Sequence, residues 1–409
     1  MATPFDMKQI RAQFPGLSRN VAGKAAIFAD GPAGSQVPVS VAQAISVSLL
    51  QLNANHGGCF ETSIQSDALL HRVHQDAATF LGTSDPDCVV FGNNMTSLTL
   101  AFSRALARTW QAGDEIILSR CDHDANVTPW VLAAQERNVT VRWIEINPDD
   151  CTLNLDSLKQ ALSKRTKLVA VGMASNAVGT IHPVRQIADL AHAAGSLVFL
   201  DAVHYAPHQL IDAPATGADF IVCSAYKFFG PHVGILWGKR EHLERLTPYK
   251  VRPASNELPD RWMTGTQNHE GIAGVGAAIA YLAALAEEGT SLRERLVSAY
   301  GRIVEHERNL GTRFLEGIST LEGYHLFGQR TMKGRVATFG IIHERLTATQ
   351  LSKQLAEEGI FTWAGNFYAL PLTEALGLEP EGMLRIGFLH SNTLEEVDRV
   401  IDTLRRIGG

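Results

Sequence analysis

The residues best suited to do chemistry are a carboxylate and an amine, Asp201 and Lys227. Asp201 follows an apolar run at 197–200, and Lys227 comes just after a second run at 220–223. Both runs are short and rich in Val, Ile, Leu and Phe, which is typical of buried parallel strands. The carboxyl ends of such strands meet at one edge of a sheet, where open α/β sheets bind their ligands. We therefore expect Asp201 and Lys227 to share one site.

Lys227 lies on a loop after a buried strand, is followed by Phe-Phe-Gly-Pro and stands outside any charged run. A lysine in such a position is suited to Schiff-base formation. The commonest cofactor partner of such a lysine is pyridoxal 5'-phosphate, whose ring nitrogen a carboxylate keeps protonated. Asp201 would be that carboxylate. If these two residues are considered alone, the alternative interpretation is that Lys227 is a surface lysine and Asp201 a helix cap. Further residues of the chain are therefore needed to distinguish the two interpretations.

If one edge of the sheet is the site, polar residues should collect directly after the strands. They follow five of the predicted strands, and the candidates are Met95, Thr96, His123, Asn176, His204 and Ser224. Free N–H groups at the helix start around Thr96 are suited to phosphate, and His123 is suited to stack on a planar ring. Each residue alone has a plain explanation as a helix cap or a turn. Their joint occurrence favours a pyridoxal phosphate site.

The composition favours a small-molecule ligand over a macromolecular one. The 409 residues are 45% hydrophobic and 19% charged, and the net charge of −6 gives no reason to expect nucleic acid or an anionic membrane as a partner. The N-terminus lacks the apolar core of a signal peptide. The longest apolar run, 273–286, is shorter than the roughly 20 residues that span a bilayer. We expect a cytoplasmic protein. Five widely spaced cysteines indicate neither a disulfide framework nor a zinc site.

The order of apolar runs predicts an α/β fold with a mostly parallel sheet covered on both faces by helices. Seven strands are expected, at 88–91, 115–119, 139–145, 168–173, 197–200, 219–224 and 234–237. The last two are too close for a helical crossover, so we expect them to be antiparallel. Long helices should follow from Thr266 to about residue 318, and then a smaller α/β unit with strands at 335–342, 360–363 and 383–388.

A final helix is announced by Thr393 and Glu396, which form a capping box. From these patterns we expect an N-terminal arm at 1–35, a large cofactor-binding sheet domain at 36–265, and the connecting helices with a small C-terminal domain at 266–409.

The motifs resemble those of the class V aminotransferase superfamily, and within it the cysteine desulfurase and selenocysteine lyase group. The matching segments are NNMTSLTLAF, CDHDANVTPW, SNAVGTIHPV, LDAVHYAPHQLID, SAYKFFGPHVGILWGK, TGTQNHEGIAGVGAAIAYL and MLRIGFLHSNTLEEVDRVIDTL. They span most of the chain from about residue 25. The resemblance implies a type I pyridoxal phosphate fold that works as a homodimer with shared active sites.

The resemblance also implies a role for each candidate residue. Lys227 becomes the Schiff-base lysine, Asp201 the partner of the ring nitrogen and His123 the stacking residue. Three hydroxyl residues fall on phosphate-binding positions: Thr96, Ser224 and, reaching across the dimer, Thr266. Two residues fall near the phenolic oxygen, Asn176 and His204. Arg385 falls on the arginine that binds the substrate carboxylate, a bidentate task that suits a guanidinium.

Three positions depart from the desulfurase pattern. Tyr226 replaces a frequent histidine, and His204 stands where many desulfurases have glutamine. The loop that holds the persulfide-forming cysteine in desulfurases aligns with WAGNFYALPL at 363–372, which has no cysteine and places Tyr368 at or near that position as a substrate contact. Cys59, on a possible entrance loop, is the one weak substitute, whereas Cys121 is fixed near the sheet edge and lacks the travel that sulfur delivery requires.

We therefore expect a pyridoxal phosphate-dependent lyase that acts on a small amino acid by β-elimination and donates no persulfide. The alternatives are an aminotransferase, an amino-acid epimerase and a true cysteine desulfurase. A silent binding or regulatory module with the same fold is the non-enzymatic alternative, although retention of Lys227, Asp201 and Arg385 argues against it.

Overall fold

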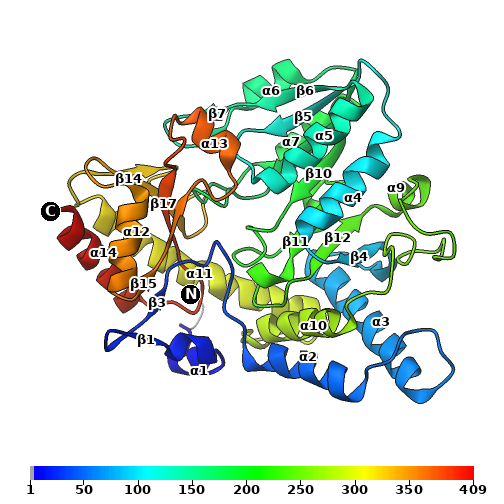
Figure 1. Ribbon diagram of the computed structural model, residues 1–409, viewed down its shortest axis with the longest axis horizontal. Coiled ribbons are helices and arrows are strands. Elements are labelled where there is room, and N and C mark those ends of the chain that lie inside the picture. Colours follow the sequence, from blue (N-terminus) through cyan, green and yellow to red (C-terminus); the bar gives the residue numbers. More distant parts are fainter. Residues whose placement is uncertain (1–3) are drawn as a thin grey trace.

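The computed structural model describes residues 4–409 and contains two α/β units connected by a long helix (Figure 1). The larger unit is built on a seven-stranded sheet, in which all seven predicted strands are found. Across the sheet, the strands are β4 (Val89–Gly92), β12 (Gly234–Gly238), β11 (Phe220–Ser224), β10 (Leu197–Asp201), β9 (Thr166–Gly172), β5 (Glu115–Ser119) and β6 (Thr140–Ile144).

The sheet is parallel except for β12, which runs antiparallel to both of its neighbours, β11 and β4. This confirms the antiparallel pair predicted from the short connection through Lys227. Most residues of the central strands are fully buried, which explains why these strands read as continuous apolar runs.

The helices of the larger unit pack around this sheet in separate groups. Helices α4 and α5 contact each other, whereas α10 contacts α2, α3 and α11. Their bounds are α2 (Val39–Gln51), α3 (Glu61–Leu81), α4 (Met95–Ala107), α5 (Thr128–Arg137), α6 (Leu155–Ala161), α7 (Val184–Ala193), α8 (Ala213–Thr216), α9 (Arg240–Arg245) and α10 (His269–Ala284). A two-stranded ribbon, β7 (Ile146–Asn147) and β8 (Thr152–Leu153), follows β6.

The first of the expected long helices begins later than predicted. Thr266 lies in the preceding loop, and α10 begins at His269 because the side chain of Asn268 caps it by accepting a hydrogen bond from the Gly271 N–H. Helix α11 (Leu292–Ile318) begins with a capping box of Ser291 and Glu294. None of the helices within residues 4–409 is long and apolar enough to cross a membrane.

The smaller unit has its own hydrophobic core and an antiparallel sheet. The sheet order is β13 (Tyr324–Phe327), β14 (Thr338–His343), β17 (Met383–Gly387) and β16 (Trp363–Gly365). Helices α12 (Ala348–Glu357), α13 (Leu370–Ala375) and α14 (Leu394–Gly408) complete the unit, and the predicted capping box of Thr393 and Glu396 is present. Strand β13 was not predicted.

The N-terminal segment is integrated with the smaller unit. It contains α1 (Met7–Ala12), β1 (Asn20–Val21), β2 (Lys24–Ala25) and β3 (Ile27–Phe28). The predicted strand at 360–363 corresponds to two strands in different sheets. The first, β15 (Ile360–Phe361), pairs with β3, and the second, β16, begins at Trp363 and pairs with β17. Asp30 then forms a bridge to Gly387, which brings the Gly/Pro turn after Asp30 close to the end of β17.

Candidate active site

Lys227 lies in a short 3-10 turn at 225–227, directly after β11. Its side chain is buried, and Nζ donates hydrogen bonds to the backbone oxygens of Pro32 and Ala33, the latter at 3.1 Å. Burial lowers the pKa of the amine to about 7, with a further contribution from the positive charge of Arg385. An amine with this pKa is partly neutral at physiological pH, and only a neutral amine is a nucleophile.

Asp201 ends β10, the strand beside β11, and faces the same cavity as Lys227. Its Oδ1 accepts a hydrogen bond from the Val203 N–H at 2.8 Å. Burial raises the pKa of this carboxyl to about 6, and the charge of Lys227 opposes the shift. Burying a charged carboxylate without a cationic or hydrogen-bonding partner costs free energy. Asp201 is therefore suited to accept a hydrogen bond from a protonated group of a ligand.

Eight of the predicted residues line this one cavity: Met95, Thr96, His123, Asn176, Asp201, His204, Ser224 and Lys227. They come from the ends of different strands, as expected for the carboxyl edge of a parallel sheet. We call it the lysine cavity.

The first turn of α4 forms one wall of the lysine cavity. Asn94 caps the helix by accepting a hydrogen bond from the Ser97 N–H at 2.8 Å, and Ser224 Oγ accepts one from the Met95 N–H at 2.9 Å. Thr96 is exposed. The positive end of this helix and the nearby hydroxyls of Ser224 and Thr96 are suited to a phosphate group.

His123 and Tyr368 stack on one another at the cavity. Their ring centroids are 5.4 Å apart and the ring planes differ by 29°. His123 Nδ1 accepts a hydrogen bond from the Ala125 N–H at 3.0 Å, which assigns the proton of the neutral ring to Nε2. Burial lowers the pKa of His123 to about 4, so the imidazole is neutral at pH 7.

Arg385 lies on β17 and is hydrogen-bonded to Asn176, which lines the lysine cavity. Its Nη1 donates to the backbone oxygen of Asn176 at 3.0 Å, and its guanidinium lies 4.2 Å from the ring centroid of Phe367. Burial lowers the pKa of Arg385 to about 9. Within the described residues, Arg385 Nε and Asn176 Oδ1 are buried and have no hydrogen-bond partner. Both atoms are therefore available to a polar ligand.

His204 lies deeper, at the junction of the two units. Its Nε2 is 3.0 Å from the hydroxyl of Thr338 in β14, and its ring contacts that of His208 edge-on at 5.1 Å. Burial keeps the pKa of His204 well below its usual value. Its Nδ1 is buried and unpartnered among residues 4–409, which makes it a third polar atom available to a ligand.

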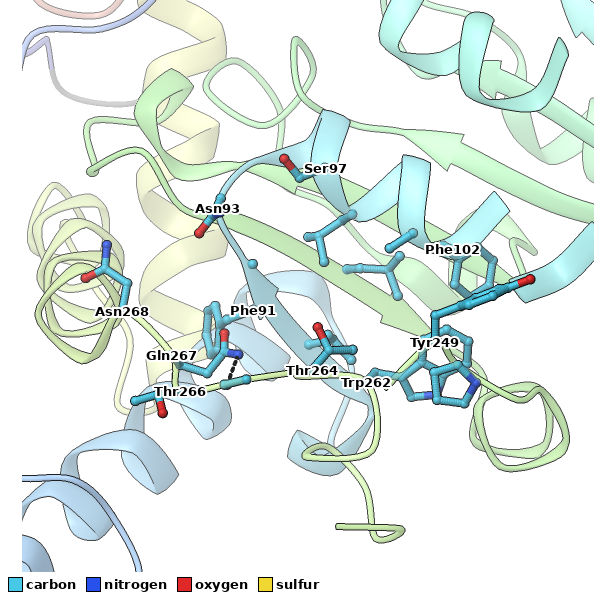
Figure 2. A pocket seen from close by; sticks show the side chains of 17 residues that line it. Phe91, Asn93, Ser97, Phe102, Tyr249, Trp262, Thr264, Thr266, Gln267 and Asn268 are labelled. Atoms are coloured by element: carbon cyan, nitrogen blue, oxygen red, sulfur yellow. Dashed lines mark hydrogen bonds between the residues drawn. The ribbon is translucent and has the colours of Figure 1, made fainter. Parts of the chain in front are cut away.

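Thr266 is separate from the other candidates. It lines a different cavity, together with Phe91, Ser97, Trp262 and Gln267, as Figure 2 shows. This second cavity also touches the first turn of α4, through Ser97. In a single copy of the chain, Thr266 is therefore not part of the lysine cavity.

Sequence reasoning missed two carboxylates at the site. Asp122 lines the lysine cavity and accepts hydrogen bonds from the Gly172 N–H at 2.9 Å and the Asn126 amide at 2.8 Å. Burial raises its pKa to about 7. Asp30 is near enough to Arg385 and Lys227 for their charges to lower its pKa, although burial still raises that pKa to about 6. The polar signal at Asp122 was visible in the sequence, directly before His123.

The lysine cavity fits pyridoxal phosphate on the features just described. It offers a buried amine, a buried carboxylate, a helix N-terminus beside two hydroxyls, and a neutral imidazole. The unpartnered buried atoms of Asn176 and His204 would gain hydrogen bonds from a polar ligand of this kind. Fold and site together define a pyridoxal phosphate-dependent enzyme of fold type I.

Comparison with known proteins gives the family. The aminotransferase class-V model matches residues 27–400, and the chain belongs to this family. The cysteine desulfurase of Klebsiella pneumoniae is 31% identical over 98% of both chains, and the aminotransferase-like protein FGM3 of Gibberella zeae is 31% identical over 99% of both. The apo structure of cysteine desulfurase from Thermococcus onnurineus matches with a TM-score of 0.89 at 25% identity, covering 100% of this chain and 99% of that one.

These comparisons confirm the expected family, the fold and the enzymatic nature of the protein. They also place it in the cysteine desulfurase-like group of pyridoxal phosphate-dependent enzymes.

Proposed function

We propose that this protein is a pyridoxal phosphate-dependent lyase that cleaves a bond at Cβ of a small amino acid and releases the product directly. The observation that carries the proposal is the segment 363–372, which contains no thiol and lies against the site. Four of the five cysteines are buried, namely Cys88, Cys121, Cys151 and Cys223.

Burial makes these four thiols poor sulfur acceptors. It raises the pKa of Cys88 to about 12 and that of Cys151 to about 11, and it raises the pKa values of Cys121 and Cys223 further. Only a thiolate attacks a substrate sulfur, so none of the four is poised for persulfide formation. Cys59 is exposed but does not line the lysine cavity.

When bound, pyridoxal phosphate supplies an electron sink next to the substrate Cα. In our proposal, Lys227 holds the cofactor covalently and later moves the Cα proton, while Asp201 keeps the ring nitrogen protonated. His123 would stack on the ring, and the first turn of α4 would hold the phosphate at Met95 and Thr96. The remaining roles belong to Ser224 at the phosphate, Asn176 and His204 at the phenolic oxygen, and Arg385 and Tyr368 at the substrate.

In the overall reaction, the substrate loses a proton from Cα and a leaving group from Cβ. Addition of water then gives a 2-oxo acid and ammonium. Arg385 would fix the carboxylate so that the Cα–H bond points toward Lys227, because the bond that breaks is selected by its alignment. Transamination and epimerisation begin with the same proton transfer and are the outcomes against which the proposal is tested.

The test is to incubate the cofactor-loaded enzyme with a panel of amino acids, including cysteine and other sulfur-containing analogues, and to identify the products by mass spectrometry. We expect pyruvate and ammonium from the substrate that is turned over. Rapid formation of alanine from cysteine, with a persulfide on the protein, would contradict the proposal. A 2-oxo acid together with aminated cofactor would instead show a transaminase.

We also propose that the protein is a cytoplasmic homodimer in which Thr266 completes the partner's site. The position of Thr266 outside the lysine cavity supports sharing. Exposed apolar side chains on α2 and around the start of α3 also support association, namely Val39, Val47, Leu49, Leu50, Phe60 and Ile64.

A subunit-mixing experiment tests the shared site. Lys227→Ala and Thr266→Glu should each be inactive alone, the second because its carboxylate repels phosphate. Refolded together, they should recover about a quarter of wild-type activity, since half of the dimers are hybrids and each hybrid has one intact site. A fully active monomer in sedimentation, or mixtures that stay inactive although hybrid dimers form, would refute the shared site.

A further inference from the structure

Residues 366–369, which we call the aromatic lid, connect β16 with α13 and have an unusual backbone. Phe367 and Tyr368 both have left-handed conformations, with φ of 56° and 59°. Bulky side chains rarely adopt this region, so the surrounding structure must hold the segment in place. Strain of this kind, at consecutive residues, is typical of functional sites.

Hydrogen bonds from the site fix the lid. Asn176 Nδ2 donates to the Phe367 oxygen at 3.0 Å, and the Asp124 N–H donates to the Tyr368 oxygen at 2.6 Å. Within the lid, Asn366 Oδ1 accepts from the Tyr368 N–H at 3.1 Å. Both aromatic residues are thus bound through their backbones to residues beside the lysine cavity.

The lid covers one face of the Arg385 guanidinium and leaves its Nε–H group without a hydrogen-bond partner among the described residues. The Phe367 ring lies on the guanidinium at 4.2 Å, while Nη1 is bound to the Asn176 oxygen and Nε is buried with no partner among the described residues. Asn176 therefore binds both the lid and the arginine. An aromatic face attracts a cation without occupying its N–H groups, so the edge of the guanidinium stays available to an anion.

We propose that Phe367 is a positioning residue for Arg385, and that the aromatic lid is a fixed wall that restricts the substrate carboxylate to the free edge of the guanidinium. The inference rests on the proposed role of Arg385 in binding that carboxylate. In this proposal the segment stays fixed at the site. A sulfur-carrying loop would instead have to move away from the site to deliver the sulfur.

Substitution of Phe367 by leucine tests the positioning role. Phe367→Leu keeps an apolar side chain but loses the attraction between ring and cation, so KM for the amino acid should rise about tenfold with kcat nearly unchanged. The matched control is Phe361→Leu, because Phe361 belongs to the same unit and its ring contacts Phe28. An unchanged KM in Phe367→Leu, or an equal rise in the control, would overturn the proposal.

A binding measurement separates this inference from the proposed reaction. Propionate offers only the carboxylate, and its affinity for the cofactor-free protein can be measured by ligand-observed NMR. Phe367→Leu should weaken propionate binding about tenfold, whereas Phe361→Leu should not. Equal affinities in wild type and Phe367→Leu would refute the positioning role. The proposed elimination can fail in the product assay while this result stands.

Hydrogen exchange tests the fixed lid first in the wild-type protein. In the wild-type protein, the amides of Tyr368 and Ala369 are hydrogen-bonded and should exchange slowly. Asn176→Ala removes one attachment and should accelerate exchange across 366–369 more than elsewhere. Exchange in the wild type as fast as in an exposed loop would show that the lid is mobile and would contradict the proposal.

Discussion

Replacing Lys227 with alanine is expected to reduce turnover by at least about 10⁴-fold, at the upper end of the effect of a positioned acid–base group. Lys227 is the buried amine of the lysine cavity, with its pKa lowered to about 7. In our account it both holds the cofactor and moves the Cα proton, so its loss removes two functions. Steady-state assay of the purified, cofactor-saturated variant measures the effect.

Lys239→Ala is the matched control for this prediction. Lys239 is a partly exposed lysine paired with Asp219 at 2.6 Å, and it does not line the lysine cavity. We expect Lys239→Ala to keep wild-type turnover. If Lys227→Ala retained more than about a tenth of the activity, Lys227 would not be the proton-transferring amine.

Replacing Asp201 with asparagine is expected to leave cofactor binding intact and to reduce turnover by roughly 10²–10³-fold. The amide has nearly the same shape as the carboxylate and keeps the hydrogen bond from the Val203 N–H. It has no charge, however, and cannot stabilise a proton on the ring nitrogen of the cofactor. The absorbance of the purified variant reports cofactor content, and kcat reports the loss.

Asp219→Asn controls for the loss of a buried carboxylate as such. Asp219 accepts hydrogen bonds from Lys239 and the Val198 N–H, outside the lysine cavity. We expect Asp219→Asn to lower thermal stability while kcat stays unchanged. Wild-type kcat in Asp201→Asn would mean that Asp201 does not support the ring nitrogen.

Much of the larger unit could be predicted from the sequence because its strands are buried on both faces. Fully buried strands such as β9 and β11 read as continuous apolar runs, and their polar ends mark the edge of the sheet. Eight of the residues that line the lysine cavity could be predicted from their places at that edge, whereas Asp122 was missed. Strand β13 has only four residues, of which Phe327 alone is buried, and it lies at the edge of the smaller sheet, so its apolar pattern is too short to predict a strand.

The contribution of the N-terminal segment could not be predicted, because it depends on tertiary pairing. Nothing local indicates that Ile27 and Phe28 pair with β15, yet this pairing and the bridge from Asp30 to Gly387 bring the turn onto Lys227. The same holds for Phe367, whose contact with Arg385 joins residues of two different segments. Such contacts link segments that are distant in sequence, and a pattern of local periodicity cannot report them.

The most direct test of the central claim is to reduce the cofactor-loaded protein with borohydride, digest it and locate the attached cofactor by mass spectrometry. Our account predicts one modified peptide, with the cofactor on Lys227. Attachment to another lysine, or no attachment after reconstitution with pyridoxal phosphate, would show that the lysine cavity is not the catalytic site.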